Sequence, residues 1–255
     1  MEFKKIKFTN TNGQQLSARL DFPDNQKPGA YVIFAHCFTC NKNLTAVRTI
    51  SKALTDNGFG VLRFDFTGLG DSEGDFADTN FSSNVQDLIA ASAYLEQEYE
   101  APKLLIGHSL GGAAVIFAAN TISSVLAVAT IGAPSSPQHV QHLIESDLEE
   151  IKKSGVAKVT IGGRSFSIKQ QFLDDINSKN LATIVKNFRK SLLVMHSPQD
   201  KTVGIENASE IYGAAMHPKS FISLNGADHL LSDKEDSFYV GHLIACWVSR
   251  YINLE

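Results

Sequence analysis

Short apolar segments alternate with amphipathic ones along most of this 255-residue chain, and that alternation limits the possible folds more than any other feature. Six segments are predicted strands: YVIFAH, GVLRFDF, KLLIGH, VLAVATIGA, SLLVMH and SFISLN. The first of them, YVIFAH, is a continuous apolar run, as expected of a strand buried on both faces. Segments with helical apolar spacing follow most of the six, as in Leu44, Val47 and Ile50. The pattern predicts an α/β fold, with a mostly parallel twisted sheet, helices on both faces and right-handed crossovers.

The chain begins with a different pattern. KKIKF and QLSARLDF alternate polar and apolar residues on either side of Asn12-Gly13, a dipeptide typical of tight hairpin turns. We therefore expect a β-hairpin ahead of the parallel strands. Further along, residues 82–99 are expected to form a helix capped by Ser82 or Ser83, and residues 233–252 to form the last helix.

Residues 134–190 interrupt the alternation. They contain an amphipathic helical pattern running from Val140 to Ile151, then KVTIGGRSFSI, which predicts a hairpin turning at Gly162-Gly163. Helical pieces are expected again within 170–188. An insertion at this point of such a sheet emerges at the carboxyl edge, where ligands bind. We expect a single domain over 1–255 with a lid or cap at about 134–190.

Composition excludes several classes of protein. The hydrophobic fraction is 43% and the formal net charge is −4, with no block of Lys and Arg, so no nucleic-acid partner is expected. No apolar run approaches the roughly 18–20 residues that cross a bilayer, and the N-terminal residues lack the apolar core of a secretory signal. The expected location is the cytoplasm, without membrane attachment.

A G-x-S-x-G motif spans 107–111, between the strand KLLIGH and a helix of small residues. A sharp strand-to-helix turn exposes the serine, and only glycines leave room for the neighbouring chain. The hydroxyl of Ser109 then stands at a helix N-terminus, where backbone N–H groups favour an anion. Ser109 is the predicted nucleophile. The alternative is a glycine-rich turn with a bystander serine.

Two more polar side chains follow strand-like segments. Asp200 comes after SLLVMH and His229 after SFISLN, so both are expected at the same sheet edge as Ser109. His229 is predicted to act as the base and Asp200 to orient it. Asp228 is an alternative acid. The other histidines, including His108 and His196, are predicted to be structural.

The stretch AHCFTC, 35–40, is the loop after the first parallel strand. A tetrahedral intermediate needs two N–H donors, one from Leu110 and one from this loop. Cys37 and Cys40 have three interpretations here: small-residue packing, a redox pair, or metal ligands with His36. Three cysteines are too few for a disulfide framework, so packing is favoured. In FDFTGLGDSEG, Asp65 and Ser72 are expected to hold the turn through hydrogen bonds to backbone.

Taken together, these motifs resemble the α/β-hydrolase (serine esterase) family over nearly the whole chain. AHCFTCNKN, LRFDFTGLGDSEG, LLIGHSLGGAA, ATIGAPSSPQHV, VMHSPQDKTVGI and LNGADHLLS are most similar to the hydrolase halves of bacterial proteins in which an α/β-hydrolase precedes an OsmC-type domain. The resemblance implies that Ser109, Asp200 and His229 are catalytic. Relatives with an HGF sequence use the N–H after the glycine; the matching residue is Phe38, with Cys37 in the glycine's place. The implied oxyanion hole is therefore Phe38 and Leu110.

The resemblance also implies an activity. FDFxGxGDSxG, GHSxGG and GADH are similar to motifs of feruloyl and cinnamoyl esterases, which makes esters of aromatic acids one candidate substrate class. We expect a serine hydrolase that cleaves small carboxylic esters through an acyl-enzyme, with no cofactor and no metal. The 255 residues hold no OsmC-type half, so the resemblance supports no claim of peroxidase chemistry. The alternatives are a thiol-dependent module in peroxide defence using Cys37 and Cys40, and a catalytically silent binding protein of this fold.

Overall fold

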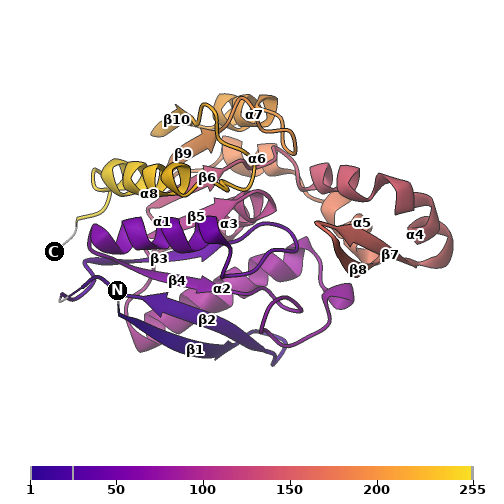
Figure 1. The fold of residues 1–255 in the computed structure, drawn as a ribbon, viewed down its shortest axis with the longest axis horizontal. Helices are drawn as coiled ribbons and strands as arrows, with labels where there is room; N and C mark the ends of the chain where they lie inside the picture. The colour runs from indigo at the N-terminus through magenta and orange to yellow at the C-terminus, as the bar shows by residue number, and fades with distance from the viewer. Residues whose placement is uncertain (1, 25, 254–255) are drawn as a thin grey trace.

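A mixed sheet of eight strands forms the centre of the molecule in the computed structural model, which describes residues 2–24 and 26–253 (Figure 1). The strand order is β1-β2-β4-β3-β5-β6-β9-β10, with β1 and β2 antiparallel to their neighbours and the others parallel. Their bounds are β1 Phe3–Thr9, β2 Gln15–Asp21, β3 Ala30–Ala35, β4 Phe59–Phe64, β5 Leu104–His108, β6 Ala127–Ile131, β9 Ser191–His196 and β10 Lys219–Ser223. The predicted hairpin and the predicted parallel strands are confirmed.

Helices cover both faces of the sheet, as predicted. On one face, α1 Thr45–Asp56 and α8 Lys234–Val248 bury apolar side chains against Val32, Phe34 and Ile106. On the other, α2 Phe81–Glu98, α3 Leu110–Thr121 and α7 Glu206–Ala214 share a buried cluster with Ile33 and Leu105. In the central strands β3, β4, β5, β6 and β9 successive residues thus face opposite clusters, which is why these strands are buried along their whole length.

Two helix boundaries differ from prediction. The N-cap of α2 is Asn80, whose side chain accepts from the backbone N–H of Ser83, while the Ser83 hydroxyl accepts from the backbone N–H of Asn80. Ser83 is therefore the third helical residue of a capping box, so both Ser82 and Ser83 lie inside the helix. The last helix ends at Val248 rather than 252.

The insertion lies between β6 and β9 and extends from the right of the molecule in Figure 1. It comprises η2 Pro137–Asp147, α4 Leu148–Ser154, the hairpin β7 Val156–Ile161 and β8 Arg164–Lys169, α5 Gln170–Asn177 and α6 Leu181–Lys186. The hairpin at Gly162-Gly163 is confirmed. The single amphipathic helix is wrong, because η2 is a 3₁₀ segment that breaks at Ile144 (φ −133°, ψ 22°) before α4 starts. Despite the break, Ile144 and Ile151 are both buried in the main apolar cluster.

Among the residues described, none of the helices is both long enough and apolar enough to span a bilayer.

Candidate active site

Ser109 stands on the turn between β5 and α3 in a strained backbone conformation, with φ 55° and ψ −129°. Neither of the flanking glycines has room for a side chain. A Cβ on Gly107 would lie 2.3 Å from the carbonyl oxygen of Gly111, and one on Gly111 would lie 2.5 Å from that of His36. Close approach of the chain at both positions fixes the sharp turn, which presents the serine hydroxyl at the start of α3.

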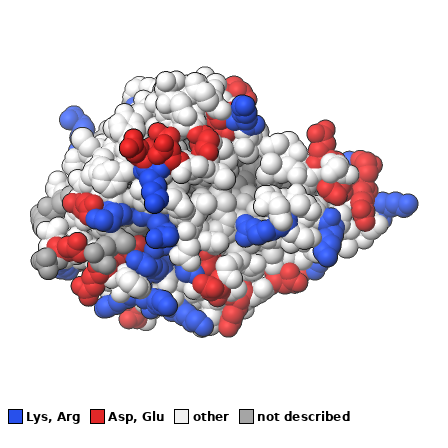
Figure 2. Space-filling view, viewed as in Figure 1, with Lys and Arg blue, Asp and Glu red and all other residues white. Residues whose placement is uncertain are grey.

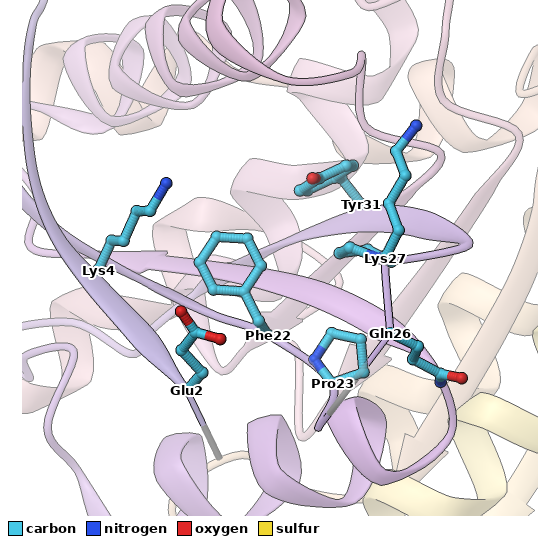
Figure 3. A pocket seen from close by; sticks show the side chains of 8 residues that line it. Glu2, Lys4, Phe22, Pro23, Gln26, Lys27 and Tyr31 are labelled. Atoms are coloured by element: carbon cyan, nitrogen blue, oxygen red, sulfur yellow. The ribbon is translucent and has the colours of Figure 1, made fainter.

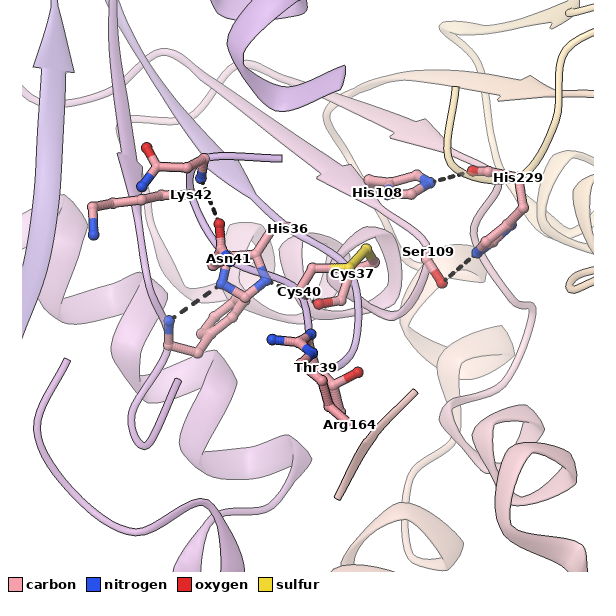
Figure 4. The surroundings of a disulfide bond; sticks show 12 residues. His36, Cys37, Thr39, Cys40, Asn41, Lys42, His108, Ser109, Arg164 and His229 are labelled. Atoms are coloured by element: carbon pink, nitrogen blue, oxygen red, sulfur yellow. Dashed lines mark hydrogen bonds between the residues drawn. A yellow bond between two sulfur atoms is a disulfide. The ribbon is translucent and has the colours of Figure 1, made fainter. Parts of the chain in front are cut away.

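A chain of hydrogen bonds joins three side chains that are distant in sequence. Nε2 of His229 lies 3.1 Å from Oγ of Ser109, and Nδ1 of His229 lies 2.7 Å from Oδ2 of Asp200 (Figure 4 shows the first contact). Each residue follows the carboxyl end of its strand, β5, β9 or β10, as the sequence predicted. The relative exposure of Ser109 is 9% and that of Asp200 is 8%, so the chain of contacts is largely shielded from water.

The surroundings of the Asp200 carboxylate favour its ionised form, because they lower its pKa. Burial by itself would raise its pKa, but hydrogen bonds from His229 and from backbone N–H groups outweigh burial and lower the pKa below its usual value. The backbone donors are Thr202 at 2.8 Å and Val203 at 2.9 Å, both to Oδ1. Asp228, the alternative acid, instead accepts the backbone N–H of Ser232 at 2.8 Å. Of these two aspartates, Asp200 is the one hydrogen-bonded to the His229 ring.

Two buried histidines hold the loops that carry these side chains. Nε2 of His108 is 2.6 Å from the carbonyl oxygen of His229 (Figure 4), and Nε2 of His196 is 2.7 Å from that of Val203, which follows Asp200. Since a carbonyl only accepts, each Nε2 donates. Burial first, and the neighbouring His229 second, lower the pKa of His108 to about 3, so it is neutral. These contacts fit the structural roles predicted for both histidines.

Acid should destabilise the fold through its buried neutral histidines. Burial lowers the pKa of His36 from 6.5 to about 4 and that of His108 to about 3. Below pH 6.5 the unfolded chain therefore binds more protons. The free energy of unfolding should decrease as the pH is lowered, with a slope that approaches about 1.4 kcal/mol per pH unit for each histidine near pH 5. Urea unfolding at pH 7.5 and 5 measures this. His108→Asn should remove about half of the dependence, and a flat profile would contradict the assignment.

The loop after β3, part of which Figure 4 shows near Ser109, contains a backbone N–H without an acceptor among the described residues. Among the described residues, neither the N–H of Phe38 nor that of Leu110 has a hydrogen-bond acceptor. Thr39 adopts a left-handed conformation with φ 60°. The Phe38 ring packs against Phe76, at 5.6 Å between centroids, and stacks on Phe172 of the insertion at 5.4 Å. This loop is therefore held on its outer side by the insertion.

Arg164, at the start of β8, is a contact that sequence reasoning missed. Its guanidinium donates to the carbonyl oxygen of Thr39 and so ties the hairpin of the insertion to the loop after β3 (Figure 4 shows both residues). No local signal marked this arginine, because its role depends on how the hairpin packs on the body of the molecule.

Cys37 and Cys40 form a disulfide, with Cα atoms 5.2 Å apart (Figure 4). The prediction that they merely pack as small side chains is wrong. A turn closed by the bond from the N–H of Cys40 to the carbonyl of Cys37 brings the two sulfurs together. Cys246 is free and exposed. No group of three or more His, Cys, Asp or Glu side chains in the described part of the chain is arranged to hold a metal ion.

The turn of FDFTGLGDSEG holds the end of the loop after β3 through contacts with Lys42. The Asp65 carboxylate accepts from the backbone N–H of Lys42 at 2.7 Å and from its ammonium at 2.5 Å. The Ser72 hydroxyl donates to the carbonyl of Asp65 at 2.6 Å. The predicted structural roles of Asp65 and Ser72 are confirmed.

Comparison with known proteins found similar hydrolases and esterases. Residues 26–140 match a family model described as serine aminopeptidase, S33. A solved esterase domain of a Rhodothermus marinus protein is 48% identical, with a TM-score of 0.81, over 99% of this chain and 100% of that one. Est1E of Butyrivibrio proteoclasticus, solved with ferulic acid, has a TM-score of 0.79 at 19% identity, over 97% and 99% of the two chains. The mouse mitochondrial palmitoyl-protein thioesterase ABHD10 is 22% identical over 87% of this chain and 75% of its own.

A strand-end serine on a strained turn, within a sheet of this order, defines a hydrolase of the α/β type. Because almost half of the residues are identical over the full length of the Rhodothermus marinus esterase domain, the chain belongs to the α/β-hydrolase family and groups with its esterases. The resemblance found in the sequence motifs is confirmed at this level.

Proposed function

We propose that this protein hydrolyses carboxylic esters through Ser109, His229 and Asp200, with an acyl-enzyme intermediate. The observation that supports this most is the chain of hydrogen bonds from Oγ of Ser109 through His229 to Asp200, at 3.1 and 2.7 Å. These distances are within the reach that a nucleophile, its base and an orienting carboxylate need.

Each group has a distinct role in the proposed reaction. Nε2 of His229 takes the proton of Ser109 as Oγ attacks the ester carbonyl, and later gives it to the leaving alcohol. Asp200 keeps Nδ1 of His229 protonated and stabilises the imidazolium that forms. Water then enters, loses a proton to His229 and releases the acid from Ser109.

The backbone N–H groups of Phe38 and Leu110 are the proposed oxyanion donors. Their lack of another acceptor among the described residues supports this, as does the place of Leu110 as the residue after the nucleophile. Donors already aimed at the developing charge need no reorganisation during the reaction.

The insertion is proposed to act as a cap over the substrate. Phe172 of α5 and Phe166 of β8 extend an aromatic cluster that begins with Phe38 and Phe76, at centroid distances of 4.9 to 5.6 Å. The cavity that Phe38, Phe76 and Leu110 line is only about 10 Å³, about the space of one water. This cavity is too small for any acyl group, so its volume does not select among esters, but the aromatic walls favour a medium-sized apolar or aromatic acyl group over a long alkyl chain.

A panel of p-nitrophenyl and methyl esters tests the proposal. Purified protein should hydrolyse acetyl, butyryl and hydroxycinnamoyl esters with kcat/KM above that for the palmitoyl ester. Failure to hydrolyse any ester of the panel would contradict the proposed function. A preference for palmitate would leave ester hydrolysis intact and overturn the substrate class.

A further inference from the structure

A recess lined mainly by cationic side chains lies where α1, α8 and the strands β2 and β4 meet. Its volume is about 490 Å³. We call it the basic recess; its lining residues are Arg19, Asn43, Thr45, Arg48, Thr49, Lys52, Arg63 and Lys234. Five of these eight are Arg or Lys and none is acidic. Figure 2 shows Lys and Arg side chains gathered on this face of the molecule, where α1 lies in Figure 1.

At the floor of the basic recess, two arginines share a single acidic partner. Arg19 and Arg63 are directly opposite each other on the antiparallel strands β2 and β4, an arrangement that costs stability for like charges. The buried Asp21 carboxylate contacts both, at 2.5 and 2.7 Å, and can neutralise only one of them. Burial lowers the pKa of Arg63 despite Asp21, and the charges of Arg19 and Arg48 add to that effect.

The wall of the basic recess adds three cations, Arg48, Lys52 and Lys234, of which one has an acidic partner. Residues 45, 48, 49 and 52 share one face of α1, because residues three and four apart are neighbours on a helix. Lys52 is paired with Asp56 at 2.5 Å. Within residues 2–24 and 26–253, neither Arg48 nor Lys234 has an ion-pair partner, although acidic residues flank Lys234 in the first turn of α8.

Another hollow of similar volume provides a contrast. It measures about 510 Å³ and is lined by residues that include Glu2, Lys4, Phe22 and Lys27 (Figure 3). Its lining includes the carboxylate of Glu2, and Lys27 pairs with Glu100 at 2.7 Å. Mixed charge gives that hollow no comparable attraction for an anion.

We propose that the basic recess is a second binding site, separate from Ser109, for a small molecule that carries a phosphate or pyrophosphate group. Arginine guanidinium groups and a lysine ammonium suit phosphate oxygens, and the hydroxyls of Thr45 and Thr49 can supply further donors. The volume of the basic recess is in the range of small-molecule sites, and its concave shape suits a compact ligand better than an extended polymer. The unpaired Arg48 and Lys234 are the residues on which recognition should depend most.

Calorimetric titration with inorganic pyrophosphate, at constant ionic strength, tests this site. Wild-type protein should bind one equivalent, and the double variant R48Q/K234Q should bind at least about tenfold more weakly, because charge-assisted contacts are lost. The control K7Q/K158Q removes the same charge from exposed positions elsewhere and should keep its affinity within about twofold. Absence of saturable binding to wild type, or equal affinity in R48Q/K234Q, would overturn the proposal.

A separate observation concerns the disulfide beside Ser109. The cross-link from Cys37 to Cys40 encloses Phe38, whose N–H is the proposed oxyanion donor, and Thr39, whose left-handed φ of 60° is unfavourable for a β-branched residue. Cys37 is buried, with 4% exposure, while Cys40 is half-buried and is the more accessible of the two. A covalent constraint therefore acts on the residues that aim the donor.

We infer that this disulfide sets the rate of ester hydrolysis according to its redox state, an inference that rests on the proposed function. A thiolate of an external dithiol attacks Sγ of Cys40, breaks the S–S bond and releases Cys37 as a thiolate, which takes up a proton. The second thiol of the dithiol then displaces Cys40, so that the dithiol is oxidised and the protein gains two thiols. Without the cross-link Thr39 can leave its left-handed conformation. The N–H of Phe38 is then no longer directed at the oxyanion.

The expected effect is partial. Removal of one oxyanion donor costs about 10² to 10³ in kcat, whereas a loosened loop that Arg164 still holds at Thr39 should lose about tenfold. Reduction of wild-type protein with dithiothreitol should lower kcat for p-nitrophenyl butyrate by this factor, and reoxidation should restore it. The variant C37S/C40S should stay at the low rate under both conditions, while C246S should respond as wild type does.

Mass spectrometry after thiol alkylation establishes which redox form is present in each assay. Equal kcat for the fully oxidised and fully reduced wild-type forms would overturn the redox inference and leave ester hydrolysis intact. Absence of hydrolysis in both forms would instead contradict the proposed function, and the redox inference with it.

Discussion

Replacing Ser109 with alanine is expected to lower kcat for p-nitrophenyl butyrate by about 10⁶-fold, the scale seen when a serine hydrolase loses its nucleophile. Oγ of Ser109 is the only heavy atom removed, and it is the atom 3.1 Å from Nε2 of His229. Without it no acyl-enzyme can form, and only the oxyanion donors and the binding surface remain to assist water.

The fold should survive this change. Alanine fits the space of serine on the strained turn, and the flanking Gly107 and Gly111 are untouched. A melting temperature close to that of wild type would show that the lost rate belongs to chemistry. Retention of more than about one hundredth of the wild-type rate in a folded Ser109→Ala variant would contradict the role of Ser109.

The variant Asp200→Asn should lower kcat by about 10⁴-fold. An asparagine amide can donate to Nδ1 of His229, which would place the ring proton on Nε2, where it blocks acceptance of the serine proton. Charge is lost at the same time, so the imidazolium that forms during attack loses its stabilising partner. Steady-state kinetics at pH 7.5 measures the effect, which should appear in kcat more than in KM.

Asp228 supplies a matched control for that variant. It is an aspartate adjacent to His229 in sequence, but its carboxylate accepts the N–H of Ser232, whereas the imidazole is hydrogen-bonded to Asp200. Asp228→Asn keeps an oxygen for the bond to Ser232, and kcat should stay within about threefold of wild type. A large loss in Asp228→Asn together with a small one in Asp200→Asn would reverse the assignment of the acid.

The sequence predicted the fold and the three strand-end side chains for one reason. In a parallel sheet the carboxyl ends of strands meet at one edge, so residues that follow strands come together regardless of their separation in the chain. Apolar runs that end in Ser109, Asp200 and His229 were therefore enough to bring these residues to one place, and the structure does bring them into contact.

Features that depend on tertiary contact could not be predicted in this way. Arg164 reaches Thr39 only because the hairpin of the insertion packs over the loop after β3. The break at Ile144 preserves the apolar spacing of a helix, so periodicity alone does not reveal it. The disulfide depends on a turn that brings Cys37 and Cys40 together, and the same spacing is compatible with free thiols.

Labelling with a fluorophosphonate, followed by mass spectrometry of the digested protein, tests the central claim most directly. An activated serine beside two free N–H donors should react stoichiometrically, with the adduct on the peptide that carries Ser109 and loss of ester hydrolysis in step with labelling. Full ester hydrolysis in protein that remains unlabelled at Ser109, or an adduct at another residue, would contradict it.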